Sequence, residues 1–231
     1  MGPVLVAIVV ALLIALLAAC GREAPSEPAP YSTPPPAAVG APQADRRPVI
    51  AAFGDSLSAG YGVEPGESYP DLLQKLLDEQ ALAYRIANAG ISGDTTSGGL
   101  ARVDSVLALE PAIVILELGG NDGLRGMPVT ATRSNLEQII VRLRGAGVRV
   151  LLAGMTLPRN YGPDYIRSFE AIYAEIAAAH KLPLIPFLLD GVAGDARWMQ
   201  PDGIHPTAEG NRRVAANVMK RLRPLLGKRR G

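Results

Sequence analysis

The sequence predicts an α/β fold in which a parallel sheet is covered by helices on both of its faces. Five short apolar runs follow one another from residue 49 onward, and after each comes a stretch with the spacing of an amphipathic helix. The apolar runs are almost uninterrupted, which is typical of strands that are buried on both faces of a sheet. Strands that alternate with helices in this way form βαβ units, and such units build a parallel sheet.

The expected strands differ in hydrophobicity. The third, PAIVILELGGND, is the most hydrophobic and is therefore expected at the centre of the sheet. Each run is short, as strands are in folds of this class. The five strands are expected at residues 48–55, 83–90, 111–122, 148–155 and 182–188.

The expected helices combine an apolar face with recognisable ends. In the first of them, the leucines between Leu72 and Leu77 recur at helical spacing. Thr95 or Asp94 is the expected N-cap of the second helix, and glycine closes the third. The five helices are expected at residues 68–82, 95–110, 135–147, 164–180 and 207–226.

The first residues have the composition of an export signal. Residues 4–19 contain no polar side chain, and this stretch is short for a membrane span. It ends in Leu-Ala-Ala before Cys20, the only cysteine of the chain, and this pattern resembles a bacterial lipobox. We therefore expect a lipoprotein-type signal peptide at residues 1–19 and lipidation of Cys20. Because Gly21 follows the cysteine, the lipoprotein is expected in the outer membrane, facing the periplasm.

A different N-terminal arrangement stays open. Residues 1–21 contain no lysine or arginine, although a signal peptide normally begins with a positive charge. The alternatives are an uncleaved N-terminal anchor and secretion into the periplasm. Residues 20–47 are expected to form an extended linker, because eight of the 20 prolines of the chain fall within residues 22–48. The folded domain is then expected at residues 48–231, which is long enough for one hydrophobic core.

Composition and motifs exclude several classes of protein. The formal net charge of the 231-residue chain is +1, so no strong field favours nucleic acid as a partner. Two histidines and one cysteine are too few for a zinc site, and neither a metal nor a cofactor is expected. The phosphate-binding patterns of nucleotide folds are missing. Ser58 stands where the serine motif of α/β-hydrolases needs its second glycine.

The ends of the predicted strands carry the parts that acyl transfer needs, and in parallel sheets these ends share one edge. Ser56 follows the first strand and is the candidate nucleophile. His205 is the candidate base, and Asp202, three residues earlier, can orient its ring. The backbone N–H groups of Ser56 and Gly93 and the side-chain amide of Asn121 are the candidate donors of an oxyanion hole.

Four segments carry a resemblance to a known family. GDSLSAGYG, ISGDTTSGGL, ELGGNDGLRG and DGIHP resemble, in this order, the four blocks of the SGNH (GDSL) hydrolases. The similarity is greatest to their bacterial subgroup of thioesterases, lysophospholipases and arylesterases. It implies a flavodoxin-like, three-layer α/β/α fold with a five-stranded parallel sheet. It also implies the catalytic roles given above for Ser56, Asp202 and His205, and the oxyanion roles of Gly93 and Asn121.

The resemblance also suggests where a substrate would bind. The segment GLRGMP resembles the mobile loop that shapes the acyl-chain site in relatives. Within it, Gly123, Leu124, Arg125 and Met127 are candidate substrate contacts. Leu157 and Tyr161, which follow the fourth predicted strand, complete the candidate set.

The expected function is that of a serine esterase for carboxylic esters and thioesters, arylesters and lysophospholipids included. Its partners would be a small acyl substrate and, through the lipid anchor, a membrane, and it is expected to be a monomer. A carbohydrate O-deacetylase with the same three residues is the alternative, and a lipoprotein that only binds lipid is a minor one. Trp198 is the only tryptophan, which favours an acyl chain over a sugar as the bound group.

Overall fold

Five parallel strands form the central sheet in the order β2-β1-β3-β4-β5. The computed structural model describes residues 45–227, and the predicted signal peptide, Cys20 and most of the linker lie outside them. No helix within the described part of the chain is long and apolar enough to cross a membrane. The strands are β1 (Val49–Gly54), β2 (Arg85–Asn88), β3 (Pro111–Glu117), β4 (Arg149–Ala153) and β5 (Leu184–Ile185).

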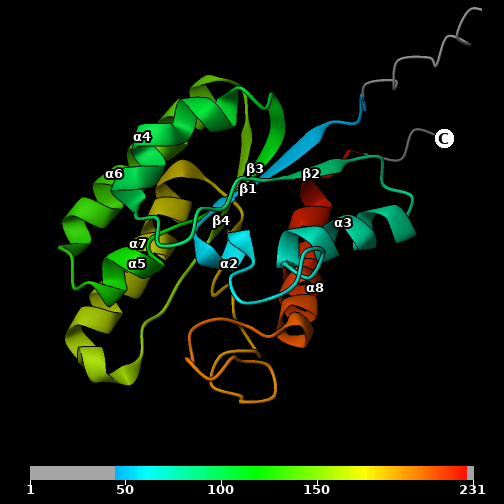
Figure 1. Ribbon diagram of the computed structural model, residues 1–231. Coiled ribbons are helices and arrows are strands. Elements are labelled where there is room, and N and C mark those ends of the chain that lie inside the picture. The colour runs from blue at the N-terminus through cyan, green and yellow to red at the C-terminus, as the bar shows by residue number, and fades with distance from the viewer. Residues whose placement is uncertain (1–44, 228–231) are drawn as a thin grey trace, which may run out of the picture. The chain divides into compact units, whose positions relative to one another are not determined.

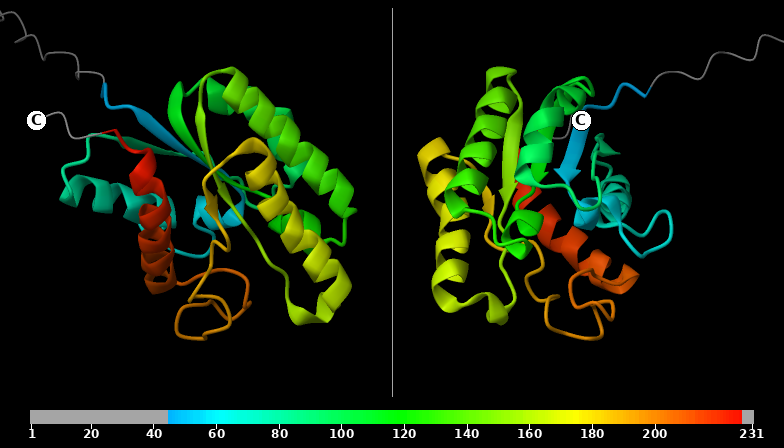
Figure 2. Two further views of the ribbon diagram at one scale, coloured as in Figure 1. Left: turned by 180° about the vertical axis from the view of Figure 1, so that it is seen from behind. Right: turned by 60° about the vertical axis from the view of Figure 1, so that its left-hand side comes forward.

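Helices cover both faces of this sheet, as Figures 1 and 2 show. Helices α3 and α8 pack together on one face, and α4, α6 and α7 pack on the other. The longer helices are α3 (Tyr69–Glu79), α4 (Thr96–Leu107), α6 (Val129–Gly145), α7 (Pro163–His180) and α8 (Ala208–Leu222). The short ones are α2 (Ser56–Ala59), α5 (Gly120–Leu124), η1 (Arg159–Tyr161) and η2 (Arg223–Leu225).

The strand order explains why the helices divide in this way. The chain runs from β1 to β2 in one direction, and then crosses over β1 to reach β3 on the other side. Because crossovers between parallel strands are right-handed, this reversal puts α3 and α4 on opposite faces. The order confirms the flavodoxin-like arrangement. It also makes the neighbouring strands β1 and β3 the switch point, where ligands bind in such sheets.

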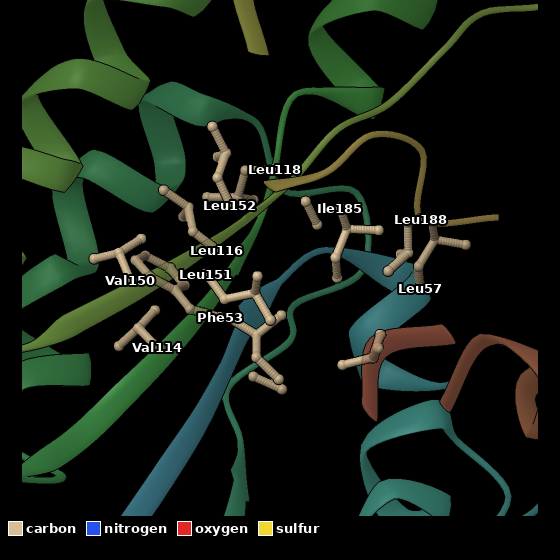
Figure 3. Close-up of a cluster of buried hydrophobic side chains, with 14 of the residues drawn as sticks. Phe53, Leu57, Val114, Leu116, Leu118, Val150, Leu151, Leu152, Ile185 and Leu188 are labelled. Carbon is tan, nitrogen blue, oxygen red and sulfur yellow. The ribbon is translucent and has the colours of Figure 1, made fainter. Parts of the chain in front are cut away.

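The core is built from cross-strand pairs of branched side chains. Val114 lies opposite Val150, and Leu116 lies opposite Leu152, in the register of β3 and β4. Figure 3 shows these four residues together with Phe53 from β1. Of the five side chains only that of Val150 has any exposure to solvent, and it is slight. Burial of each such side chain contributes about 1.5–3 kcal/mol, so the centre of the sheet is a rigid base for the loops above it.

All five strands are shorter than predicted, and the difference is largest for β3 and β5. β3 ends at Glu117, because Gly119 adopts a φ of +112° and α5 begins directly afterwards. β5 contains only two residues, since Pro183 and Pro186 flank it and proline has no N–H for a sheet hydrogen bond. The central position of β3 is confirmed.

Helix ends agree with the sequence pattern where a polar cap is present. Thr95 is the N-cap of α4, and its side chain accepts a hydrogen bond from the Gly98 N–H. By contrast, α6 begins at Val129, six residues before the predicted start at residue 135. Its first turns are polar and carry no side-chain cap, so neither the apolar pattern nor a capping residue marks them.

Candidate active site

Ser56 occupies a sharp junction between β1 and α2. The strand ends at Gly54, and Ser56 is the first residue of the short helix. The Asp55 side chain caps this helix by accepting a hydrogen bond from the Leu57 N–H at 3.0 Å. A Cβ on Gly54 would overlap the Glu117 carboxyl and the Ser58 hydroxyl, so only glycine lets the strand end this close to its neighbour β3. The junction holds Ser56 half-buried at the edge of the sheet.

His205 and Asp202 lie on one tight turn before α8. Asp202 Oδ1 accepts hydrogen bonds from the backbone N–H groups of Ile204 (2.9 Å) and His205 (3.0 Å). Its Oδ2 lies 2.7 Å from His205 Nδ1. A bridge between Met199 and Pro206 closes the base of this segment. The turn therefore fixes the carboxylate and the ring to each other through three separate contacts.

The hydrogen bonds around Asp202 decide which ring nitrogen carries the proton. Burial alone would raise the pKa of Asp202, but the hydrogen bonds from His205 and Ile204 outweigh it and lower this pKa to about 2. An ionised carboxylate can only accept, so His205 Nδ1 must donate to it. In the neutral ring Nε2 is then the acceptor, and it lies 2.8 Å from Ser56 Oγ. The Ser56 hydroxyl thus donates to a nitrogen that can take its proton.

The three candidate oxyanion donors come from separate segments that meet at this edge. The Ser56 N–H belongs to the first turn of α2, where backbone N–H groups have no partner within the helix. Gly93 adopts a φ of +79°, a conformation that favours glycine. Asn121 is in α5, and its Nδ2 group donates to Asp55 Oδ2 (3.0 Å) and to the Asp94 carbonyl (2.9 Å).

A cavity of about 470 Å³ opens beside these groups. Ser56, Gly93, Asn121 and His205 give it a polar end. The rest of its wall is mostly apolar and comes from the loops that follow β1, β3, β4 and β5. These wall residues include Leu57, Tyr61, Leu124, Met155, Leu157, Pro158, Phe187, Leu189, Met199 and Ile204. The arrangement can bind an apolar group and place a polar atom at its end next to Ser56.

The model of the GDSL-like lipase/acylhydrolase family matches residues 52–213, a span that contains every group described above. The chain belongs to this family. It is thus an ester hydrolase, an enzyme that adds water to an acyl ester. The family membership agrees with the fold, because relatives with solved structures share the same sheet.

Named relatives of this acylhydrolase are similar over most of their length. It is 48% identical to Esterase TesA of Pseudomonas aeruginosa, over 75% of this chain and 87% of the relative. It is 41% identical to Thioesterase 1/protease 1/lysophospholipase L1 of Escherichia coli (strain K12), over 75% of this chain and 83% of the relative. A crystal structure of TesA superposes with a TM-score of 0.75 at 47% identity, covering 77% of this chain and 99% of that one.

A buried polar network, which the sequence analysis did not predict, lies next to the junction between β1 and α2. Glu117, at the end of β3, has no exposure to solvent. Its Oε2 accepts hydrogen bonds from the Asp55 N–H (3.2 Å) and the Ser58 hydroxyl (2.8 Å), and Ser58 Oγ also lies 3.0 Å from Tyr69 Oη. Glu117 Oε1 is buried and has no hydrogen-bond partner among the described residues. The only sign of this network in the sequence is that Glu117 is the one acidic residue of an otherwise apolar strand.

Burial and mutual repulsion keep one proton on this pair of carboxyls. Burial raises the pKa of Glu117 well above its usual range, and the nearby charge of Asp55 raises it further. Burial also raises the pKa of Asp55, but hydrogen bonds from Leu57 and Asn121 favour its ionised form. We therefore assign the proton to Glu117 and the negative charge to Asp55. The unpartnered Oε1 agrees with this assignment, since an unpaired buried charge is far more costly than a neutral acid.

The predicted substrate contacts divide into two groups. Leu124 and Leu157 line the cavity, whereas Gly123, Arg125, Met127 and Tyr161 do not. Gly123 is buried against Leu157, and a Cβ there would crowd that side chain.

The other three hold the surrounding loops in place. The Arg125 guanidinium donates to the Gly93 carbonyl (2.9 Å), and Tyr161 Oη donates to the Leu124 carbonyl (2.8 Å). The Met127 carbonyl accepts from Tyr165 Oη at 2.7 Å.

Two aromatic side chains, Tyr61 and Trp198, lie near the His205 turn. The Tyr61 ring lies 4.5 Å from the His205 ring, centre to centre, and is more than half exposed at the cavity. The sequence analysis did not identify it as a site residue. Trp198 lies outside the cavity wall, on the segment that leads to the Asp202 turn, with the Arg213 guanidinium of α8 3.9 Å above its ring. Within residues 45–227, no three His, Cys, Asp or Glu side chains are arranged to hold a metal ion.

Proposed function

We propose that this acylhydrolase cleaves carboxylic esters and thioesters of apolar acyl groups through Ser56, His205 and Asp202. One observation carries the proposal. A continuous path of hydrogen bonds leads from Ser56 Oγ through the His205 ring to an ionised Asp202, and it begins at the polar end of an apolar cavity.

In the first half of the reaction, Ser56 Oγ attacks the acyl carbon while its proton passes to His205 Nε2. The carbonyl electron pair moves onto oxygen, and the N–H groups of Ser56 and Gly93 stabilise the charge. Asn121 contributes by sharing an amide hydrogen that otherwise points to Asp55 or Asp94. Collapse of the tetrahedral species expels the alcohol or thiol, which leaves with the proton from His205. The acyl group remains on Ser56.

In the second half, water attacks the acyl-serine and gives a proton to His205 Nε2. The acyl–oxygen bond breaks, Ser56 Oγ takes that proton back, and the carboxylic acid leaves. Asp202 keeps its negative charge throughout and stabilises the imidazolium that forms in both halves. Each step needs only groups of this chain and water.

The wall of the cavity supports an acyl chain as the bound group. Each CH₂ that enters an apolar site gains up to about 0.8 kcal/mol, or roughly fourfold in kcat/KM. The activity of esters should therefore rise with chain length until the cavity is filled. The Escherichia coli relative is named as a thioesterase and a lysophospholipase, and this supports thioesters and lysophospholipids as further substrates.

The test is the hydrolysis of p-nitrophenyl esters from acetate to palmitate by the full chain. We expect Ser56→Ala to abolish turnover at every length, and Ser105→Ala, an exposed serine of α4, to leave it unchanged. Equal activity of wild type and Ser56→Ala would reject the nucleophile. Activity on acetate alone would favour the carbohydrate deacetylase, and no activity at all would favour a lipid-binding lipoprotein.

We also propose that the enzyme is a lipoprotein that faces the periplasm. The apolar segment before Cys20 and the proline-rich residues after it support this location. In a Gram-negative host, labelled palmitate should enter the wild-type chain and not Cys20→Ser. If palmitate also labels Cys20→Ser, the acylated residue is not Cys20.

A further inference from the structure

The side chain of Arg102 lies behind the candidate site and holds three separate segments. It extends from α4, and 18% of it is exposed. Its Nε donates to Asp94 Oδ2 at 2.7 Å, Nη1 to the Ala89 carbonyl at 2.8 Å, and Nη2 to the Gly54 carbonyl at 2.9 Å. Each nitrogen of one rigid guanidinium thus binds a different part of the chain. None of the three bonds reaches the substrate cavity.

The bond to Gly54 acts on the segment that carries the nucleophile. Gly54 is the last residue of β1, two positions before Ser56. The same carbonyl accepts the Ile91 N–H at 3.1 Å. Arg102 and Ile91 therefore meet at one oxygen, which ties the end of β1 to the loop that contains Gly93.

The bond to Asp94 acts on the other two oxyanion donors. Asp94 is the residue after Gly93, and its carbonyl accepts the amide of Asn121. Asp94 Oδ1 also accepts the Thr95 N–H at 3.0 Å. A Cβ on Gly98 would overlap this carboxylate, so the glycine of α4 makes room for the ion pair. The position of Asp94 thereby sets the positions of both Gly93 and Asn121.

We propose that Arg102 is a positioning residue for the oxyanion hole. All three donors, the N–H groups of Ser56 and Gly93 and the amide of Asn121, belong to segments that this guanidinium fixes. The inference rests on the proposed function, since it assigns a role within that reaction. The planar group also stacks on the Phe53 ring, 4.6 Å from its centre, which sets its orientation. A lysine has one compact charge and cannot reproduce this three-way geometry.

The role predicts a specific kinetic signature. Arg102 forms no hydrogen bond with Ser56, His205 or Asp202 in the structure, so proton transfer should keep its pH dependence. The loss should fall on the stabilisation of the transition state. We expect Arg102→Met to lower kcat by about tenfold to a hundredfold, with KM changed by less than about twofold. Arg102→Lys should recover only part of that loss.

The experiment measures kcat, KM, pH profile and Tm on one p-nitrophenyl ester, with the full chain. Arg142→Met is the matched control, because Arg142 is also paired with an aspartate, Asp104, but at the surface between α6 and α4. It should retain the wild-type kcat. Asp94→Asn, which keeps the backbone and weakens the ion pair, should lower kcat in the same direction as Arg102→Met.

Three outcomes would overturn the inference. The first is a wild-type kcat in Arg102→Met, and the second is a raised KM with kcat unchanged. The third applies if Arg102→Met does not fold: then wild-type kcat in both Arg102→Lys and Asp94→Asn would reject the role. If wild type itself shows no hydrolysis that depends on Ser56, the proposed function fails first, and this role fails with it.

Discussion

Asp202 accepts three hydrogen bonds, two from backbone N–H groups and one from the His205 ring. The two backbone bonds do not involve the imidazole ring, so they hold the carboxylate in place before any proton moves. Its pKa of about 2 keeps it ionised at every pH at which the enzyme would work. The acidic limb of activity should therefore not reflect the titration of Asp202.

Asp202→Asn tests whether this charge fixes the ring. An amide can present an N–H to His205 Nδ1, which favours the tautomer that cannot accept the Ser56 proton. We expect kcat to fall by about 10⁴ while the fold is retained, as loss of the orienting carboxylate does in other serine hydrolases. Steady-state kinetics on a p-nitrophenyl ester measure the effect.

Asp195→Asn is the control, because the pKa of Asp195 is also about 2 but its partner is Arg197 and not His205. It should leave kcat unchanged. An equal loss in both variants would mean that the loop as a whole, and not the contact with His205, is responsible.

Glu117 makes a prediction about stability and pH. Its pKa is raised in the folded protein above the value near 4.3 of an unfolded chain, so the folded state retains a proton that the unfolded state releases. The contribution of this group to stability is complete below about pH 4 and is lost progressively as the pH rises toward the folded pKa.

Glu117→Gln cannot ionise and should escape that loss. We expect its free energy of unfolding, relative to wild type, to increase between about pH 5 and about pH 8. Urea unfolding at several pH values measures it, with the exposed Glu79→Gln as control. Parallel pH curves for Glu117→Gln and wild type would show that Glu117 is ionised in the folded protein.

At the scale of elements, the junction from β1 to α2 depends on the space that Gly54 leaves. Gly54→Ala would force its methyl group into the Glu117 carboxyl and the Ser58 hydroxyl. We expect a loss of about 1–3 kcal/mol or more in stability, together with a loss of activity, because Ser56 would move with the strand end. Thermal unfolding and ester hydrolysis measure the two effects.

Gly145→Ala separates this crowding from a general effect of alanine. Gly145 ends α6 at an exposed position, where a Cβ would meet nothing within 4 Å. Alanine should there leave stability unchanged or raise it by up to about 1 kcal/mol. Comparable losses in both variants would contradict the steric explanation.

The elements show which local patterns could be predicted. The strands β1, β3 and β4 are continuous apolar runs, and Thr95 has the hydroxyl that an N-cap needs, so composition alone located them. The length of β5 and the start of α6 were predicted wrongly, for physical reasons. Proline at both ends limits the strand, and the first turns of the helix are polar and uncapped.

At the scale of the whole molecule, the sequence predicted which loops meet, because parallel strands present their carboxyl ends at one edge. Ser56, Asn121 and His205 accordingly line one cavity, although their segments are far apart along the chain. Contacts across that distance were not predictable. Tyr61 and Glu117 lie within two of the family-like segments, GDSLSAGYG and ELGGNDGLRG, but these segments do not say what the two side chains contact, and Arg102 lies outside all four segments.

The topology also predicts an order of local stability. β3 is central and buried almost throughout, whereas β2 is an edge strand whose residues are half-buried or exposed. We expect backbone amides of β2 to exchange with deuterium well before those of β3. Hydrogen exchange followed by mass spectrometry measures the order. Equal protection of both strands would indicate that the sheet opens only as a whole.

Trp198 gives the molecule an optical property. It is the only tryptophan of the chain, and it is joined to the Asp202 turn by sequence and to α8 by the stacked Arg213. All tryptophan emission therefore comes from one point on the segment that leads to the candidate catalytic residues Asp202 and His205. A change in the position of that turn alters the contact between indole and guanidinium, and with it the intensity of the emission. Stopped-flow fluorescence of the unlabelled enzyme therefore tests whether the turn moves during acylation and deacylation.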